Sequence, residues 1–336
     1  MNKLYPWQSE LWQHWVGLRT RLPHALLLKG PQGVGKFHFA MNLAQSLLCE
    51  KPGEKGYACQ SCSSCHWFIQ ETHPDFRLLQ PDILSAPEEE KEGAKKPARQ
   101  ISVDQIRALS DFSNLSSHQG GSRIVLIHPA EAMNANAANA LLKTLEEPAG
   151  NMLIILVCHK PQQLLATILS RCLTLSVTAP PLEVSSAWLQ RQGISNPASL
   201  LAQAGFAPLL ALQAAEDSKA ATEYLDFLKE ISQPAKLDIF TLADQLQRTE
   251  PAKVILWLQQ WAYDLLSIKL TGKIRYTLEL TDSIINISKD IELVNLLHFQ
   301  KELAVAKREA VHPLNPRLLF ESLLLSYYRL TVHHVH

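Results

Sequence analysis

The sequence predicts an α/β domain built on a parallel sheet in its first half and an all-α second half. Up to residue 179, short apolar runs alternate with segments whose apolar residues recur at helical spacing, and a glycine-rich loop joins the first run to a helix. After Ala179-Pro180-Pro181 no comparable run follows, and the chain is patterned as amphipathic helices. Strands that alternate with helices are typical of a parallel sheet covered on both faces.

The strands and helices of the first half are predicted from length and residue type. Residues 123–127 (Arg-Ile-Val-Leu-Ile) and 152–157 (Met-Leu-Ile-Ile-Leu-Val) are predicted to form buried strands from their length and their β-branched residues. Residues 25–29 and 76–79 are expected to form shorter strands. Helices are expected over residues 37–48, 103–112 and 135–147, the last of which is ended by Pro148. Residues 81–97, rich in Glu, Lys and Pro, are expected to form a solvated loop.

Two patterns support helices in the second half. Apolar residues at steps of three and four form a single stripe that we expect to face a core: Val254, Leu258, Trp261, Leu265 and Ile268. Trp257 is assigned to the same core. Asn315-Pro316 supplies an N-cap and a proline at the first helical position, so a helix is expected from there to about residue 330.

Size and composition narrow the functional classes. With 336 residues and 37.6 kDa, the chain is expected to form two or three domains. Its 32 basic and 32 acidic side chains cancel, which argues against a protein that binds nucleic acid tightly by itself. The N-terminus does not resemble a signal peptide, and residues 152–158 are too few to span a bilayer. We therefore expect a cytoplasmic protein.

The glycine-rich loop matches the phosphate-binding P-loop pattern G-x-x-x-x-G-K. Gly30, Gly33 and Gly35 allow backbone N–H groups to curl round a phosphate, and Lys36 adds a positive charge. The loop follows an expected strand and opens an expected helix, which is the context that the motif requires. The alternative is a tight strand-to-helix turn with an incidental lysine.

Two positions that hold magnesium in P-loop ATPases have changed. Phe37 stands where a Ser or Thr hydroxyl ligates the metal. The strand at 123–127 is followed by His128 and Pro129 instead of acidic residues, and the next carboxylate is that of Glu131. We expect no magnesium site and no ATP hydrolysis, although weak nucleotide binding through Gly30, Gly33, Gly35 and Lys36 remains open.

Four of the six cysteines lie close together with the spacing C-x(9)-C-x(2)-C-x(2)-C: Cys49, Cys59, Cys62 and Cys65. Four thiolates are a complete ligand set for one tetrahedral zinc, so we predict a structural zinc module. An iron–sulfur cluster and unmetallated thiols are the alternatives. A cluster of the bacterial type would place a cysteine three residues after Cys65, where none occurs. His66 is a substitute ligand or, in the simpler interpretation, a surface residue.

The chain resembles bacterial DNA polymerase III clamp-loader subunits, which are AAA+ proteins, along nearly its whole length. The segment from Asn139 to Pro148 (Asn-Ala-Leu-Leu-Lys-Thr-Leu-Glu-Glu-Pro) is similar to the family's signature helix, and Ser170-Arg171-Cys172 to its Ser-Arg-Cys motif. The resemblance implies an AAA+ P-loop domain over residues 1–179 with a zinc module at 49–65. It further implies a small helical lid over 180–216 and a helical collar for oligomerisation over 217–336.

The resemblance also implies a function within an arc of subunits that loads a sliding clamp onto primed DNA. The implied partners are the gamma/tau ATPase subunits and the delta subunit, with the clamp and primer-template DNA reached through the complex, and no membrane. Arg171, within the Ser170-Arg171-Cys172 motif, would be an arginine finger that enters a neighbour's ATP site in trans. The alternative for Arg171 is an ordinary salt-bridge arginine.

Within that family, the departures favour a non-catalytic member. The lost magnesium ligands, the opening Tyr5-Pro6-Trp7 and the His73-Pro74-Asp75 that follows the cysteines all favour a member other than the gamma/tau motor subunits. Residues 205–208, in the lid region, contain no arginine to sense the chain's own nucleotide. The alternative functions are a catalytically active gamma/tau-type ATPase and a P-loop small-molecule kinase. The kinase hypothesis explains neither the cysteines nor the helical second half.

Overall fold

The computed structural model describes residues 4–85, 98–114, 122–148, 151–310 and 315–332. The chain divides into two compact units, Met1–Val184 and Ser185–His336. Most of the loop expected over 81–97 lies outside the described residues. The division of the second half into a lid and a collar stays a prediction.

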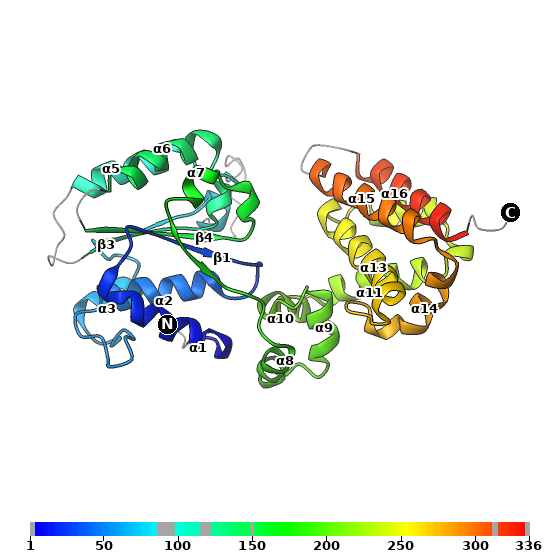
Figure 1. Cartoon of the computed structure of the whole chain (residues 1–336), viewed down its shortest axis with the longest axis horizontal. Coiled ribbons are helices and arrows are strands. Elements are labelled where there is room, and N and C mark those ends of the chain that lie inside the picture. The colour runs from blue at the N-terminus through cyan, green and yellow to red at the C-terminus, as the bar shows by residue number, and fades with distance from the viewer. Residues whose placement is uncertain (1–3, 86–97, 115–121, 149–150, 311–314, 333–336) are drawn as a thin grey trace. The chain divides into compact units, whose positions relative to one another are not determined.

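The first unit contains a five-stranded parallel sheet with the order β2-β3-β4-β1-β5 (Figure 1). The strands are β1 (Ala25–Lys29), β2 (Phe76–Leu79), β3 (Arg123–Ile127), β4 (Met152–Cys158) and β5 (Leu173–Ser176). In the register, Ala25 lies opposite Ile154, and Phe76 lies opposite Ile124. The four predicted strands are confirmed, and β5 was not predicted.

Helices cover both faces of this sheet. Figure 1 shows α5 (Val103–Asn114), α6 (Ala135–Glu146) and α7 (Ala166–Leu169) on one face. The other face carries α1 (Ser9–Leu18), α2 (Lys36–Leu48) and α3 (Ser63–Ile69). A single turn, α4 (Asp82–Ser85), follows β2. The predicted α/β architecture, with helices on both faces, is confirmed.

Alternating strand residues supply the two cores. In β1, Leu27 belongs to the cluster beneath α5 and α6, whereas Leu26 and Leu28 belong to the cluster beneath α1 and α2. The same alternation divides Ile124 from Val125 in β3. Because side chains of a strand point to opposite faces in turn, a strand that is apolar throughout must be covered on both sides.

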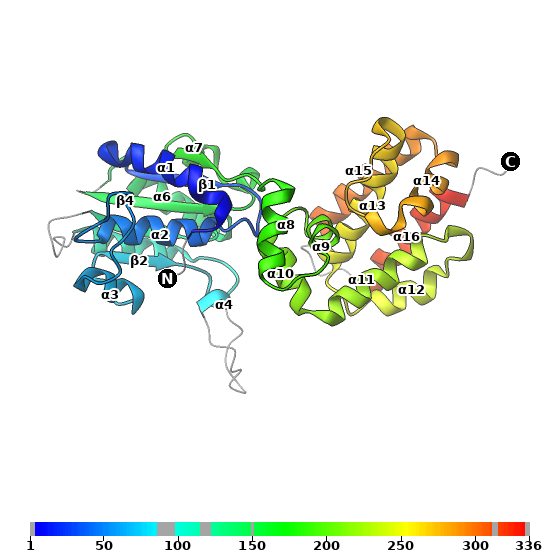
Figure 2. The ribbon, with the colours of Figure 1, turned by 90° about the horizontal axis from the view of Figure 1, so that it is seen from below.

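The second unit is entirely helical among its described residues. Its helices are α8 (Leu182–Arg191), α9 (Pro197–Gln203), α10 (Pro208–Glu216), α11 (Ser218–Ile231), α12 (Ile239–Leu246), α13 (Pro251–Thr271), α14 (Thr281–Asp290), α15 (Leu293–Glu309) and α16 (Pro316–Val332). Leu189, Leu201 and Ala211 form one small core, and residues from α11 to α16 form a larger one. In the larger core, α12 lies beside α16, and α13 packs against α15 (Figure 2).

The expected stripe on α13 lies in this larger core. Trp261 and Leu265 are fully buried, Trp257 is 6% exposed, and Ile268 packs at the margin. The predicted cap of α16 is also present, because the N–H of Arg317 donates to Oδ1 of Asn315 at 3.1 Å. Both helical predictions are confirmed.

Among the residues described, no single helix has the length and apolar composition to cross a membrane. One bent pair, α9 with α10 at 105°, meets those two criteria jointly.

Candidate functional site

The P-loop connects β1 to α2 and needs its glycines. Gly35 has a φ of 84°, and a Cβ at this position would lie 2.6 Å from a ring carbon of Tyr5. A Cβ on Gly30 would lie 1.9 Å from the carbonyl oxygen of Val177, just beyond β5. Gly33 also has a positive φ, of 77°. A side chain at Gly30 or Gly35 would therefore clash as well as strain the backbone.

Lys36 is buried and turned toward its own loop. Lys36 is only 2% exposed, and its Nζ donates to the carbonyl oxygens of Gly30 at 2.7 Å and Pro31 at 2.5 Å. Burial lowers the pKa of the Lys36 ammonium to about 8, although the nearby Glu131 carboxylate opposes the shift. A phosphate in this loop would have to compete with two backbone carbonyls for the ammonium.

The N-terminal segment holds the P-loop from outside. Nε1 of Trp7 donates to the carbonyl oxygen of Val34 at 3.0 Å, and Nε2 of Gln8 donates to that of Gly35 at 2.8 Å. Tyr5 stacks on Trp7 with ring centroids 4.9 Å apart. The Tyr5-Pro6-Trp7 segment noted in the sequence thus lies against the P-loop, with Trp7 and the following Gln8 bonded to its backbone.

Aromatic rings occupy the carboxyl end of β3, where P-loop ATPases carry the acidic residues that hold magnesium. The ring of Phe37 lies 4.5 Å from that of His128, and His128 lies 5.4 Å from His159, which follows β4. Nε2 of Gln80 is 3.0 Å from Nδ1 of His128. Burial is the main cause that lowers the pKa of both histidines to about 4, so both rings are neutral at pH 7.

Glu131 joins this group, which the sequence did not predict. A short turn over Ala130–Ala132 returns its carboxylate to the sheet edge, where both oxygens accept from the N–H of His159 at 2.9 and 3.2 Å. Burial and the Glu131 charge raise the pKa of the Cys158 thiol to about 12. The carboxylate is therefore engaged by the backbone after β4.

The four cysteines of the predicted module converge. Their Sγ atoms all lie within 4.8 Å of one another, and the Cys49–Cys62 and Cys59–Cys65 pairs are each 3.9 Å apart. A tetrahedral zinc with Zn–S bonds of about 2.3 Å would separate its sulfurs by about 3.8 Å. All the cysteines are free, so no disulfide competes. The cluster has the geometry to hold a metal ion.

Backbone hydrogen bonds orient these sulfurs. The N–H of Cys59 donates to Sγ of Cys49 at 3.2 Å, that of Cys62 to Cys59 at 3.3 Å, and that of Cys65 to Cys62 at 3.4 Å. Such bonds favour thiolates, the form that binds metal. His66 is exposed and lies outside the set of converging ligands.

His73 links the cysteine module to the sheet. Its Nδ1 accepts from the N–H of Asp75 at 3.0 Å, and its Nε2 lies 2.8 Å from Oγ of Ser64 on α3. Ser64 in turn donates to the carbonyl oxygen of Leu48, at the end of α2. His73-Pro74-Asp75, noted in the sequence, therefore joins α3, α2 and the start of β2.

Arg171 follows α7 and forms an ion pair within the chain. Its Nη2 lies 2.7 Å from Oε1 of Glu146, the last residue of α6, and its Nη1 donates to the carbonyl oxygen of Thr167 at 3.0 Å. Ser170 is exposed, whereas Cys172 packs at the margin of the core. Arg171 is thus the charged residue of the Ser170-Arg171-Cys172 motif, and in this structure it is paired with Glu146.

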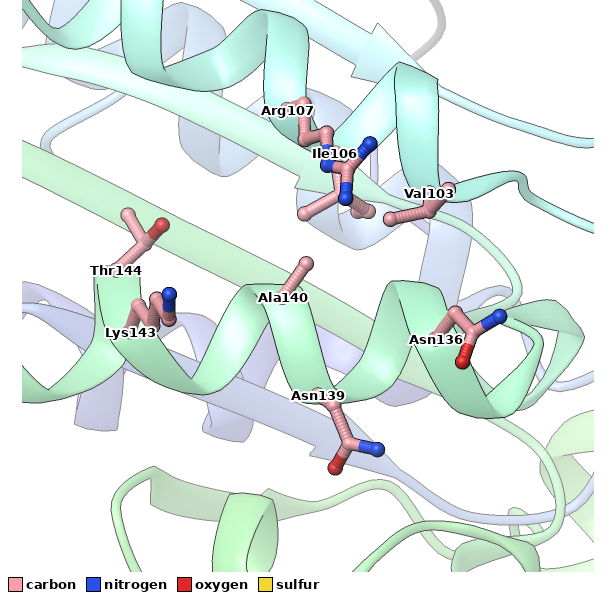
Figure 3. A pocket seen from close by; sticks show the side chains of 8 residues that line it. All are labelled: Val103, Ile106, Arg107, Asn136, Asn139, Ala140, Lys143 and Thr144. Carbon is pink, nitrogen blue, oxygen red and sulfur yellow. The ribbon is translucent and has the colours of Figure 1, made fainter.

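A groove of about 620 Å³ lies between α5 and α6 (Figure 3). Arg107 extends from α5, while Asn136, Asn139, Lys143 and Thr144 stand on α6. The two cations and the polar side chains can bind an anion that carries hydrogen-bond acceptors. The sequence marked the α6 segment but not this groove, because its α5 wall is distant in the chain.

The segment at 205–208 turns between α9 and α10. Phe206 has a positive φ of 65°, and the guanidinium of Arg275 lies 4.7 Å from the centre of its ring. An arginine is therefore near this segment, but it comes from the loop before α14 and stacks on an aromatic ring.

The chain is similar to known proteins of the DNA polymerase III delta' family. The family described as "DNA polymerase III, delta subunit" matches residues 8–181, just over half of the chain. A DNA polymerase III subunit delta' from Yersinia pestis is 30% identical over 96% of this chain and 95% of its own. That from Pseudomonas aeruginosa is 43% identical over 63% of this chain, and that from Escherichia coli 32% identical over 59%. The match spans 61% of the Pseudomonas protein and 56% of the Escherichia protein.

Proposed function

The chain belongs to the DNA polymerase III delta' subunit family, and from this premise we propose that it is a non-catalytic subunit of the clamp loader. In this role it helps to assemble the arc that places the sliding clamp on primed DNA. Its partners are the gamma/tau ATPase subunits and the delta subunit. The observation that carries the non-catalytic role is the group of Phe37, His128 and His159, which fills the edge of the sheet with neutral rings.

Phosphoryl transfer depends on positioning and on charge stabilisation, and this site lacks the groups for both. Phe37 has no oxygen to bind magnesium, and the neutral ring of His128 cannot replace a carboxylate. Glu131 is engaged by the N–H of His159. The loop glycines and Lys36 can still bind ATP, but only weakly, because the ammonium must first leave the Gly30 and Pro31 carbonyls.

Steady-state ATP hydrolysis tests this proposal. The purified chain should hydrolyse ATP no faster than a Lys36→Ala variant does, with or without magnesium. The same protein should support clamp loading when it is combined with the motor and delta subunits. Magnesium-dependent turnover that Lys36→Ala abolishes would identify an active ATPase and overturn the proposal.

We also propose that the cysteine module binds one structural zinc. Four thiolates fill every position of a tetrahedral ion, so no site is left for water or substrate. The module packs on α1, where Tyr57 stacks on Trp12 with ring centroids 4.7 Å apart and Nε1 of Trp12 donates to the carbonyl oxygen of Lys55 at 3.0 Å. Zinc would therefore stabilise an outer wall of the first unit and take no part in chemistry.

For Arg171 we propose the role of an arginine finger in a neighbouring ATPase subunit. The Arg171 side chain is one-third exposed at the end of a short helix, so it can reach beyond the surface of its own chain. Its planar fork suits the oxygens of a transferring phosphoryl group. Arg171→Ala should leave assembly intact and lower the ATP turnover of the whole loader in part, because only one of its sites loses a finger. Arg171→Lys should not restore the rate fully.

The groove between α5 and α6 is our proposed contact with the DNA backbone. Lys143 and Arg107 are exposed cations, although Nη1 of Arg107 lies 3.8 Å from Oδ1 of Asp104, in a chain with no net charge, as expected of a weak contact shared among subunits. Lys143→Ala should weaken binding of primed DNA by the assembled loader and reduce the slope of log affinity against log salt by about 1. An unchanged slope would exclude Lys143 as a phosphate contact.

A further inference from the structure

Glu146 holds the guanidinium that the proposed function assigns to a neighbour's ATP site. We propose that this glutamate is a positioning residue that competes with ATP phosphate for Arg171, and so restrains turnover until the complex is fully engaged. This inference rests on the proposed role of Arg171 as a finger.

Both terminal nitrogens of Arg171 are occupied in the chain. Nη2 lies 2.7 Å from Oε1 of Glu146, and Nη1 donates to the carbonyl oxygen of Thr167 at 3.0 Å, with Oγ of Ser170 at 3.5 Å. A phosphoryl group bound by the same two nitrogens would meet the Glu146 carboxylate beside it. Because two anions repel each other, Arg171 must leave Glu146 to serve the phosphate.

The two side chains are presented by anchored elements. Leu145, next to Glu146, is 2% exposed, and Ile168 on α7 is fully buried in the same core cluster. The ends of α6 and α7 are therefore held together by packing that does not depend on the ion pair. Release of Arg171 requires a change of side-chain rotamer and no movement of the backbone.

The restraint should be modest. The side chains of Arg171 and Glu146 are 35% and 50% exposed, and ion pairs with that exposure change an equilibrium by at most about fivefold. Several negative charges on a bound triphosphate can therefore displace one carboxylate. The pair should slow basal turnover without preventing it.

The next residue provides a matched control. Glu147 is exposed, and its side chain forms no ion pair among the described residues. Glu147→Gln removes the same charge one position away, whereas Glu146→Gln keeps the size of the side chain and an amide oxygen but weakens the hold on Arg171. Equal melting temperatures and metal contents of the two variants would establish that both fold normally.

The experiment measures ATP turnover by assembled loaders of equal stoichiometry, first without and then with clamp and primed DNA. We expect Glu146→Gln to raise turnover without clamp by up to about fivefold at the one site that Arg171 serves, and therefore by less in the loader as a whole, and Glu147→Gln to leave turnover unchanged. In an Arg171→Ala background, Glu146→Gln should have no effect. Unchanged or lower turnover in Glu146→Gln, with a clear loss in Arg171→Ala, would overturn the competition while leaving the finger in place. No loss in Arg171→Ala would overturn both.

Discussion

Replacing Cys62 by serine should remove the metal from the cysteine module. Sγ of Cys62 lies 3.9 Å from that of Cys49 and accepts from the N–H of Cys65, and its own N–H donates to Cys59. The Cys62 residue is also the N-cap of α3. The substitution therefore affects both the ligand set and the start of this helix.

The size of the effect follows from linkage between metal binding and folding. Structural zinc contributes roughly 10–16 kcal/mol to the folding of isolated zinc-finger peptides. At a free zinc concentration that saturates both proteins, each thousandfold loss of zinc affinity lowers the stability of the folded protein by about 4 kcal/mol. The loss should be local, because Trp12 and Tyr57 still tie the module to α1.

Elemental analysis of dialysed protein is the assay. Wild type should contain one zinc per chain, and Cys62→Ser should contain much less and be cleaved faster by protease within residues 49–65. Cys172→Ser is the control, since Cys172 packs at the margin of the core and lies outside the four-cysteine set. Iron or no metal in wild type, or a full zinc complement in Cys62→Ser, would refute the reasoning.

Three further predictions concern stability and assembly. Asp264→Ala should lower the free energy of unfolding, measured by urea titration, by about 3–5 kcal/mol. The reason is that the fully buried Asp264 carboxylate accepts hydrogen bonds from three backbone N–H groups. A loss under about 1 kcal/mol would contradict this role. Stability should fall between about pH 6.5 and 4, because His128 and His159 protonate near 6.5 when unfolded but near 4 when folded. A flat profile over that range would disprove the burial of neutral rings. Deletion of the residues after Glu216 should abolish co-purification with the motor subunits, and full incorporation would exclude the proposed collar.

The parts of the fold that the sequence predicted well are those with strong local patterns. In β3 and β4 every residue is buried, and apart from Arg123 at the start of β3 every residue is apolar, so each strand appears in the sequence as an apolar run. In β5 only Leu175 is buried, and a four-residue strand with one buried position has no periodicity to detect. Its place in the sheet is set by pairing with β1, where Leu26 lies opposite Leu173. That long-range contact leaves no signal in the segment itself.

The candidate site, like the fold, has parts that local sequence patterns predict and parts that depend on contacts distant in the chain. The P-loop and the cysteines were predicted because their spacing alone places the groups together. His159 and its contact with Glu131 were missed, since their meeting depends on β3 lying beside β4 with both carboxyl ends at one edge. A signal was present in principle: polar residues directly after two buried strands converge when the strands are parallel neighbours. The order of the strands, which the sequence did not supply, was needed to use it.

Phe37 and His128, which replace magnesium-binding residues, are physically compatible with each other because their rings pack together. A phenylalanine ring at position 37 beside ionised carboxylates would put apolar surface against groups that need water or metal. With His128 in place of an acid, the neighbour is instead a neutral ring 4.5 Å away, and His159 extends the contact. The packing that fills the site thus offsets the loss of metal binding. If the chain is non-catalytic, as proposed, rigid packing at this edge would suit a subunit that presents Arg171 to a neighbour.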